Sequence, residues 1–188
     1  MKMPQPQAAD QKRPQKFVIV EDSREQLPLD FSPFADCRVI RAEIWPGDYS
    51  IQSMTNFAAI ERKSVADFIG TMKDAYAGFG STTPKRFDRE LKALRGYNID
   101  GFTGFVIIEP DVVPGIHPLG AFEQIQNGTY RSAIPPSKVL AFVKSIRKNW
   151  KVPVHFADSR EHAARIVHDK LKAEWTLRMG YREFEDAK

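Results

Sequence analysis

Apolar residues in this chain first occur in short runs that suit β-strands. Residues 17–20 and 105–108 are wholly apolar, which is typical of strands covered on both faces of a sheet. Between these two runs, shorter segments with more alternation predict strands over residues 37–44, 48–52 and 57–63. A Trp-Pro-Gly turn separates the first two of these three segments. Five strands are therefore expected before residue 109.

Helical spacing of apolar residues begins after residue 64. Ser64 suits the N-cap position and Asp67 occupies the capping-box position three residues later, which predicts a helix over 65–73. Pro84 suits the first turn of a second helix, which is expected to reach Gly96. Further helical patterns cover residues 118–127, 136–149 and 158–177, with a short strand at 152–156 between the last two.

Strands that first cluster and then alternate with helices predict an α/β fold. Because two strands are apolar throughout, helices are expected on both faces, giving a restriction-endonuclease-like α/β/α sandwich with a central mixed sheet. The length of 188 residues suits one domain, which we place at 16–178. The Pro- and Gln-rich segment 1–15 predicts a disordered tail, and residues 179–188 are expected to form a C-terminal tail.

Composition narrows the class of protein. No apolar run reaches the roughly 18 residues that a membrane span needs, and the N-terminal segment lacks the apolar core of a secretory signal. Cys37 is the single cysteine, which excludes an intrachain disulfide and a zinc site of the CxxC type. We therefore expect an intracellular, cytoplasmic protein without membrane association.

Charge is distributed unevenly along the chain. The net charge of +4 divides into +3 for residues 1–16, −4 for residues 17–137 and +5 for residues 138–188. Basic ends suit contacts with phosphates, whereas central carboxylates suit bound cations, so DNA is a fitting partner. A mild basic excess also serves solubility alone, so charge by itself does not decide between these functions.

The side chains that carry chemistry are expected where strands 48–52 and 57–63 meet. Glu61 and Lys63 are two residues apart, so their side chains project from one face of a strand, together with Phe57 and Ala59. A carboxylate and an ammonium on such a half-apolar face need compensation. The turn between the two strands can bring Asp48 beside Glu61, which predicts two hard oxygen ligands for Mg²⁺ or Mn²⁺. Lys63 would then orient the water that attacks a phosphate.

Three motifs in this order carry a resemblance to a known family. They are Val20-Glu21-Asp22-Ser23-Arg24-Glu25, Gly47-Asp48-Tyr49, and Glu61-Arg62-Lys63 followed by Asp67. From about residue 17 to residue 171, the sequence resembles the XPF/Mus-type structure-specific endonucleases, a branch of the restriction-endonuclease-like superfamily. An apolar strand that ends in Glu109 and the segment 156–161 add to this resemblance.

The resemblance implies a role for each motif residue. It implies that Asp48 and Glu61 ligate the metal and that the main-chain carbonyl of Arg62 adds a ligand. It also implies that Lys63 assists the attacking water. The residues that it implies to support the site are Asp22, Glu25, Arg62 and Asp67.

Substrate and assembly are implied in the same way. The family resemblance implies cleavage of branched or flapped DNA near a junction of duplex and single strand, a chemistry used in DNA repair. It also implies a homodimer through the nuclease domain, which we expect to use the helices at 118–127 and 136–149. Family members carry a tandem helix-hairpin-helix module that this chain lacks, and the Gly-rich loop 75–83 lacks a Gly-Arg-Leu run. A stand-alone enzyme from a prokaryote or phage is expected.

Several of these residues also have simpler explanations. Glu61 and Lys63 would pair on an exposed edge strand, and Asp67 would only cap its helix. Arg62 projects from the opposite face of the strand, where it would make an ordinary salt bridge. A basic helix face, formed by Arg86, Arg89 and Lys92, would contact phosphate or only solvent.

Two other functions compete with the proposed enzyme. A junction resolvase or restriction-type nuclease of the same superfamily would use the same metal site on DNA of another shape. A non-catalytic DNA-binding or dimer-partner subunit would be expected to lack one of Asp48, Glu61 and Lys63. All three are present, which favours a metal-dependent endodeoxyribonuclease.

Overall fold

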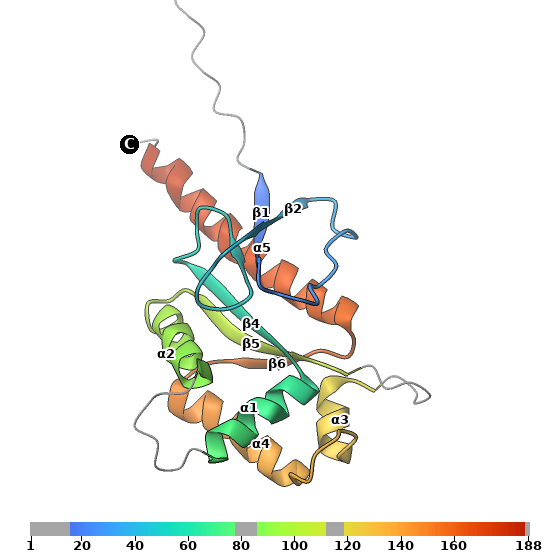
Figure 1. Ribbon diagram of the computed structural model, residues 1–188. Helices are drawn as coiled ribbons and strands as arrows, with labels where there is room; N and C mark the ends of the chain where they lie inside the picture. The colour runs from blue at the N-terminus through green and yellow to red at the C-terminus, as the bar shows by residue number, and fades with distance from the viewer. Residues whose placement is uncertain (1–15, 78–85, 112–118, 187–188) are drawn as a thin grey trace, which may run out of the picture.

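A six-stranded mixed sheet forms the centre of the molecule (Figure 1). The computed structural model describes residues 16–77, 86–111 and 119–186. The strands lie in the order β2-β1-β3-β4-β5-β6. Their bounds are Phe17–Asp22 (β1), Cys37–Ala42 (β2), Tyr49–Ile51 (β3), Ala58–Ser64 (β4), Thr103–Glu109 (β5) and Val154–Phe156 (β6).

Strand direction changes at β3 and nowhere else in this sheet. β3 is antiparallel to both of its neighbours, β1 and β4, whereas the pairs β1–β2, β4–β5 and β5–β6 are parallel. All residues of β1 are buried, as are all but the first of β5, which confirms the two doubly covered strands expected from their apolar runs.

Helices cover both faces of the sheet, which confirms the α/β/α architecture (Figure 1). The apolar residues of α1, α2, α3 and α4 form one core with one face, and those of α5 form a second core with the other face. The helices are α1 (Val65–Ala77), α2 (Arg86–Ile99), α3 (Ala121–Asn127), α4 (Pro136–Ser145), the π-helical turn η1 (Ile146–Trp150) and α5 (Arg160–Asp186). None of the helices in the described segments has the length and apolar character that a membrane span requires.

The alternation of β4 decides which face each of its side chains reaches. Ile60 belongs to the core on the α5 side, and Ala59 belongs to the core under α1 and α2. Glu61 therefore shares the face of Ala59, and Arg62 shares the face of Ile60, as a period of two residues requires. Phe57 precedes β4 and packs against the α5-side core, so its expected place beside Ala59 is wrong.

Several boundaries differ from those expected. α1 reaches Ala77, so residues 75–77 of the expected loop are helical, and residues 78–83 lie outside the described residues, as does Pro84. α4 ends at Ser145 because the chain continues as the π-helical turn η1. The strands at 37–44 and 152–156 are shorter than expected, whereas that at 105–108 begins earlier.

The C-terminal helix differs most from the element expected from the sequence. A tail was expected at 179–188, but α5 continues to Asp186, so that expectation is wrong over 179–186. Trp175 and Met179 still pack against the α5-side core, which extends the helix face that contacts the sheet. The tail expected at 1–15 lies outside the described residues.

The close approach of α2 to β5 at Gly104 gives a test of this packing. A Cβ at Gly104 would lie 2.6 Å from the carbonyl oxygen of Leu94 and 3.0 Å from the Cβ of Tyr97. We expect Gly104→Ala to displace α2 and lower the free energy of unfolding by about 1–3 kcal/mol, measured by urea denaturation. Gly96→Ala in the same helix is the control, because a Cβ there meets nothing within 4 Å and should stabilise the helix by up to about 1 kcal/mol. Equal stability of the two variants would contradict the close packing.

Candidate active site

A cleft of about 1280 Å³ opens where β4 leads into α1. Its walls include residues 22 and 24–27 at the end of β1, Trp45 and Asp48 before β3, and residues 61–63 of β4. The first two turns of α1 and residues 86–90 of α2 complete the walls. The cleft therefore gathers the three sequence motifs, although they lie on separate elements.

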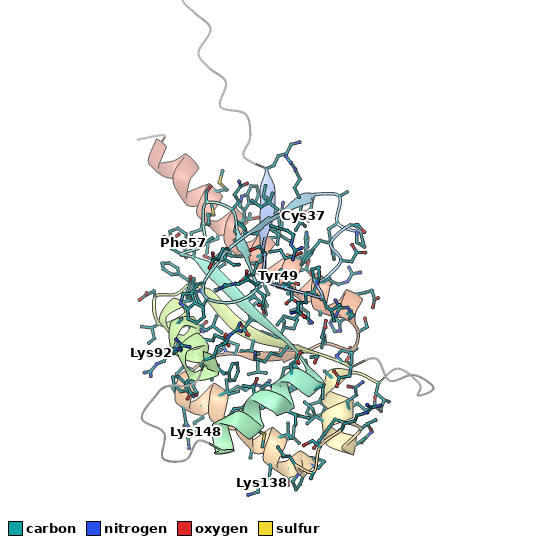
Figure 2. All side chains as sticks on the ribbon, viewed as in Figure 1. Cys37, Tyr49, Phe57, Lys92, Lys138 and Lys148 are labelled. Atoms are coloured by element: carbon teal, nitrogen blue, oxygen red, sulfur yellow. The ribbon has the colours of Figure 1, made fainter. Side chains whose placement is uncertain are left out.

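Pairing between β3 and β4 brings Asp48 to the same cleft as Glu61. Tyr49, near the centre of the molecule in Figure 2, pairs with Ile60 in the antiparallel register. The main-chain N–H of Asp48 donates to the carbonyl oxygen of Ile60 at 2.8 Å. The main-chain N–H of Arg62 in turn donates to Oδ2 of Asp48 at 2.7 Å. These bonds fix the carboxylate of Asp48 against the strand that carries Glu61.

Gly47 allows the turn before Asp48 to lie so close to β4. Its φ angle is +81°, a conformation that favours glycine, and a Cβ at this position would lie 2.7 Å from the carbonyl oxygen of Ile60. Any other residue would be strained and would push the turn away from β4. The fold therefore requires glycine directly before Asp48.

Burial and mutual repulsion make the two acidic residues costly in their charged forms. Burial raises the pKa of Glu61, and the nearby charge of Asp48 raises it further. Burial also raises the pKa of Asp48, against the hydrogen bond that it accepts from the N–H of Arg62. Two neighbouring carboxylates with raised pKa values bind a proton or a cation readily.

Lys63 supplies part of the compensating charge. Its Nζ lies 2.8 Å from Oε1 of Glu61 and 4.0 Å from Oε2 of Glu90, and 4.8 Å from the ring centroid of Phe87. Burial alone would lower the pKa of Lys63, but the Glu61 carboxylate raises it, so the ammonium keeps its charge. The expected placement of Glu61 and Lys63 on one face is thus present, and Glu61 is buried and Lys63 partly buried on a central strand rather than on an exposed edge.

Glu90 is a third acidic side chain that the sequence analysis missed. It is only 1% exposed, accepts from Nε of Arg86 at 2.7 Å, and raises the pKa of Glu61. A signal was present in the sequence, because Glu90 falls three residues after Phe87 and one before Leu91, on the apolar stripe of its helix. A carboxylate on such a stripe needs a cationic partner, which Lys63 and Arg86 provide.

Arg62 extends to the opposite face of the sheet, where it forms a buried ion-pair network. Its guanidinium contacts Oε1 of Glu25 at 2.8 Å and also pairs with Glu109. Glu109 pairs in addition with Arg160, at the start of α5. Burial alone would raise the pKa of Glu25, but the hydrogen bond and charge of Arg62, together with hydrogen bonds from the backbone of residues 26 and 27, lower it below its usual range. The simpler explanation of the Arg62 side chain, a salt bridge on the far face, therefore agrees with the structure.

Asp22, at the end of β1, lines the cleft and is paired with Arg24. Nη2 of Arg24 lies 2.6 Å from Oδ2 of Asp22, and the main-chain N–H of Arg24 donates to Oδ1 at 2.9 Å. Burial alone would raise the pKa of Asp22, but these bonds lower it. The main-chain N–H of Asp22 also donates to the carbonyl oxygen of Asp48 at 2.8 Å, which links β1 to the turn before β3.

The remaining candidates lie on the two helices that border the cleft. Asp67 accepts a hydrogen bond from the Ser64 hydroxyl at 3.0 Å, so it takes part in capping α1 and also lines the cleft. Arg86 and Arg89 line the cleft, whereas Lys92 lies on the exposed part of α2, away from it.

The charges of the cleft favour a bound cation. Seven carboxylates and five cationic side chains line it, so a phosphate backbone would meet a net excess of negative charge. The carboxylates of Asp48 and Glu61 are hard oxygen donors of the kind that Mg²⁺ and Mn²⁺ prefer, so these residues fit such an ion. The contribution of the Arg62 carbonyl stays a prediction.

A second group of possible metal ligands lies outside the cleft. Asp36, Cys37 and His168 place one ligand atom each within 4.8 Å of one another. The two ring nitrogens of His168 lie 2.9 Å from Oδ1 of Asp36 and 2.8 Å from Oδ1 of Asp169, and Lys172 lies 3.4 Å from Asp36. Both ring nitrogens of His168 thus contact carboxylate oxygens, which gives this group a structural explanation without a metal.

The raised pKa values of Asp48 and Glu61 give a test without DNA. A carboxyl whose pKa is raised on folding stabilises the fold while protonated, and this stability is lost as pH rises through the raised pKa. In EDTA, we expect the free energy of unfolding to fall between about pH 4 and pH 8, and to fall less steeply in Asp48→Asn. Urea denaturation across this range measures both slopes. Asp100→Asn, at an exposed site, is the control, and a slope for Asp48→Asn equal to that of the unmodified protein would contradict the coupling.

Comparison with known proteins shows the family to which this chain belongs. The sequence matches the family model of the ERCC4 domain over residues 20–169. The structure of XPF from Aeropyrum pernix matches with a TM-score of 0.52 at 16% identity, over 89% of this chain and 69% of that chain. Its complex with DNA matches with a TM-score of 0.52 at 15% identity, over 86% and 66%. Comparison with curated protein sequences gives no significant match. Because the family model covers most of the chain and the XPF structures share its fold, this chain belongs to the ERCC4-domain family of XPF-type nucleases.

Proposed function

We propose that the chain is a DNA endonuclease that hydrolyses phosphodiester bonds with a divalent cation held by Asp48 and Glu61. One observation supports this most directly. The two carboxylates share a cleft, each with a raised pKa, and Lys63 lies 2.8 Å from Glu61. Such a group is costly in a folded protein unless a cation offsets the charge.

Each residue of the proposed site has a separate role in hydrolysis. Mg²⁺ or Mn²⁺, when bound, polarises the scissile phosphate and lowers the pKa of a coordinated water. Oδ2 of Asp48 accepts the N–H of Arg62, which holds this carboxylate in one orientation toward the cation. The ammonium of Lys63 orients the attacking water and offsets charge that develops on the phosphate. Glu90 and Glu61 keep that ammonium in place.

The proposed substrate is branched, flapped or junction DNA. The XPF structure from Aeropyrum pernix in complex with DNA supports DNA as the polymer, because it shares this fold. Arg24, Arg86 and Arg89 line the same cleft and are exposed, so they are available to phosphates. A resolvase or restriction-type nuclease would use the same ligands, and only the preferred DNA shape distinguishes these enzymes. A non-catalytic subunit is disfavoured because the acidic pair and Lys63 are together in one cleft.

Cleavage assays test the proposed site. Labelled flap, fork, splayed and linear duplex DNA should be cut in Mg²⁺ or Mn²⁺ and left intact in EDTA. Asp48→Ala and Lys63→Ala should each lower the rate by at least about 100-fold, because each removes a group that acts on the reacting phosphate or water. Lys92→Ala, on the same helix as Arg86 and Arg89 but outside the cleft, should cut at the normal rate. Cleavage that persists in Asp48→Ala would refute the assignment of the metal site.

We also propose that two copies associate through α3 and α4. Phe122 of α3 is 44% exposed, although it is a large apolar side chain, which suits a surface that is covered by a second copy. Light scattering should give twice the chain mass of 21.4 kDa, and Phe122→Glu should shift the mass toward one chain. Leu177→Glu, at an exposed site on α5, is the control. A mass of 21.4 kDa at every concentration would contradict the dimer.

A further inference from the structure

An exposed tryptophan lies at the rim of the cleft. Trp45 is 55% exposed and lines the cleft, three residues before Asp48. Among the described residues, its ring stacks on no other aromatic ring and its indole N–H has no hydrogen-bond partner. An indole buries much apolar surface when it is covered, so its exposure leaves a large favourable contact unused.

The backbone on both sides of Trp45 is held in place. The carbonyl oxygen of Ile44 accepts from Nη2 of Arg24 at 2.7 Å, and Arg24 is itself held by Asp22. On the other side, Gly47 lies against the backbone of Ile60. Because both neighbours are fixed to the sheet, the indole is presented from a rigid support, which lowers the entropy lost when a ligand covers it.

The surroundings of Trp45 suit a nucleic-acid strand. Arg24, Arg86 and Arg89 line the same cleft as Trp45, so cations for phosphates and a ring for a base occur together. Proteins that bind single strands combine these two features, because each base offers a flat face to an aromatic side chain. In a duplex, both faces of a base are covered by its neighbours in the stack, so an indole cannot reach them without unstacking the helix.

We propose that Trp45 stacks on an unpaired nucleobase of the strand that enters the cleft. The strand beside the scissile phosphate is then single-stranded at this base, and Trp45 selects for DNA that offers one there. This inference rests on the proposed nuclease function, because it takes DNA to be the ligand of the cleft. Trp45 acts as a positioning and specificity residue, and it takes no part in the hydrolysis itself.

Binding measured in EDTA tests stacking separately from cleavage. Fluorescence anisotropy should follow a labelled oligothymidylate and a duplex of equal length. Trp45→Ala should weaken single-strand binding roughly 5- to 150-fold and change duplex binding less than about 2-fold, whereas Trp45→Phe should retain most of the affinity. Leu27→Ala removes another exposed apolar side chain of the cleft that has no flat ring. Equal losses in Leu27→Ala and Trp45→Ala would overturn stacking in favour of a general apolar contact.

An abasic series identifies the base that is contacted. Each oligonucleotide in the series lacks one base, at a different position along the strand. At one position, loss of the base should weaken binding to the unmodified protein but leave binding to Trp45→Ala unchanged. Additive losses at every position would overturn the inference, even if the protein cleaves DNA normally. Absence of cleavage of every DNA in Mg²⁺ and Mn²⁺ would instead refute the proposed function. Equal urea midpoints of Trp45→Ala and the unmodified protein would show that the variant is folded.

Discussion

Removal of water from two neighbouring carboxylates is the physical constraint on which the cleft depends. Asp48 and Glu61 each cost free energy in the charged form, because burial raises both pKa values and a nearby carboxylate raises each further, Glu25 for Asp48 and Asp48 for Glu61. Lys63 and the N–H of Arg62 offset part of this cost, and Glu90 adds a further negative charge beside the ammonium. This cost supports the proposal of a divalent ion at the site, because a buried acidic pair adds little to the stability of a fold by itself.

The sheet is the support that makes such an arrangement possible. β3 reverses direction between β1 and β4, so a single turn places the backbone before β3 against β4. Main-chain hydrogen bonds then fix the backbone and the carboxylate of Asp48 against β4. α1 and α2 then wall the cleft on the face that Glu61 and Lys63 share, while α5 packs on the opposite face. Backbone hydrogen bonds therefore determine where the Asp48 carboxylate lies, whereas side chains determine the charge of the cleft.

The sequence predicted the sheet, the sandwich of layers and the shared face of Glu61 and Lys63, because these follow from strand periodicity over short distances. It did not predict the burial of Glu90, which depends on how α2 lies across β4, a contact between segments far apart in the chain. The length of α5 was underestimated, since the contact of Met179 with the core follows from tertiary packing. Local sequence patterns predict helices, strands and the face of the sheet that a side chain reaches. Ion pairs such as those of Glu109 with Arg62 and Arg160 depend on how separate helices and strands pack together.

Arg62 contributes to both sides of the sheet at once, through different parts of the same residue. Its amide faces the acidic pair, while its guanidinium is clamped by Glu25 and Glu109, and through Glu109 it is tied to Arg160 at the first turn of α5. The orientation of the Asp48 carboxylate is thereby coupled to the docking of α5 on the opposite face of the sheet. A substitution at position 160 consequently leaves Arg62 as the one cation beside Glu109 among the described residues, so a change in α5 reaches the residue whose amide holds Asp48.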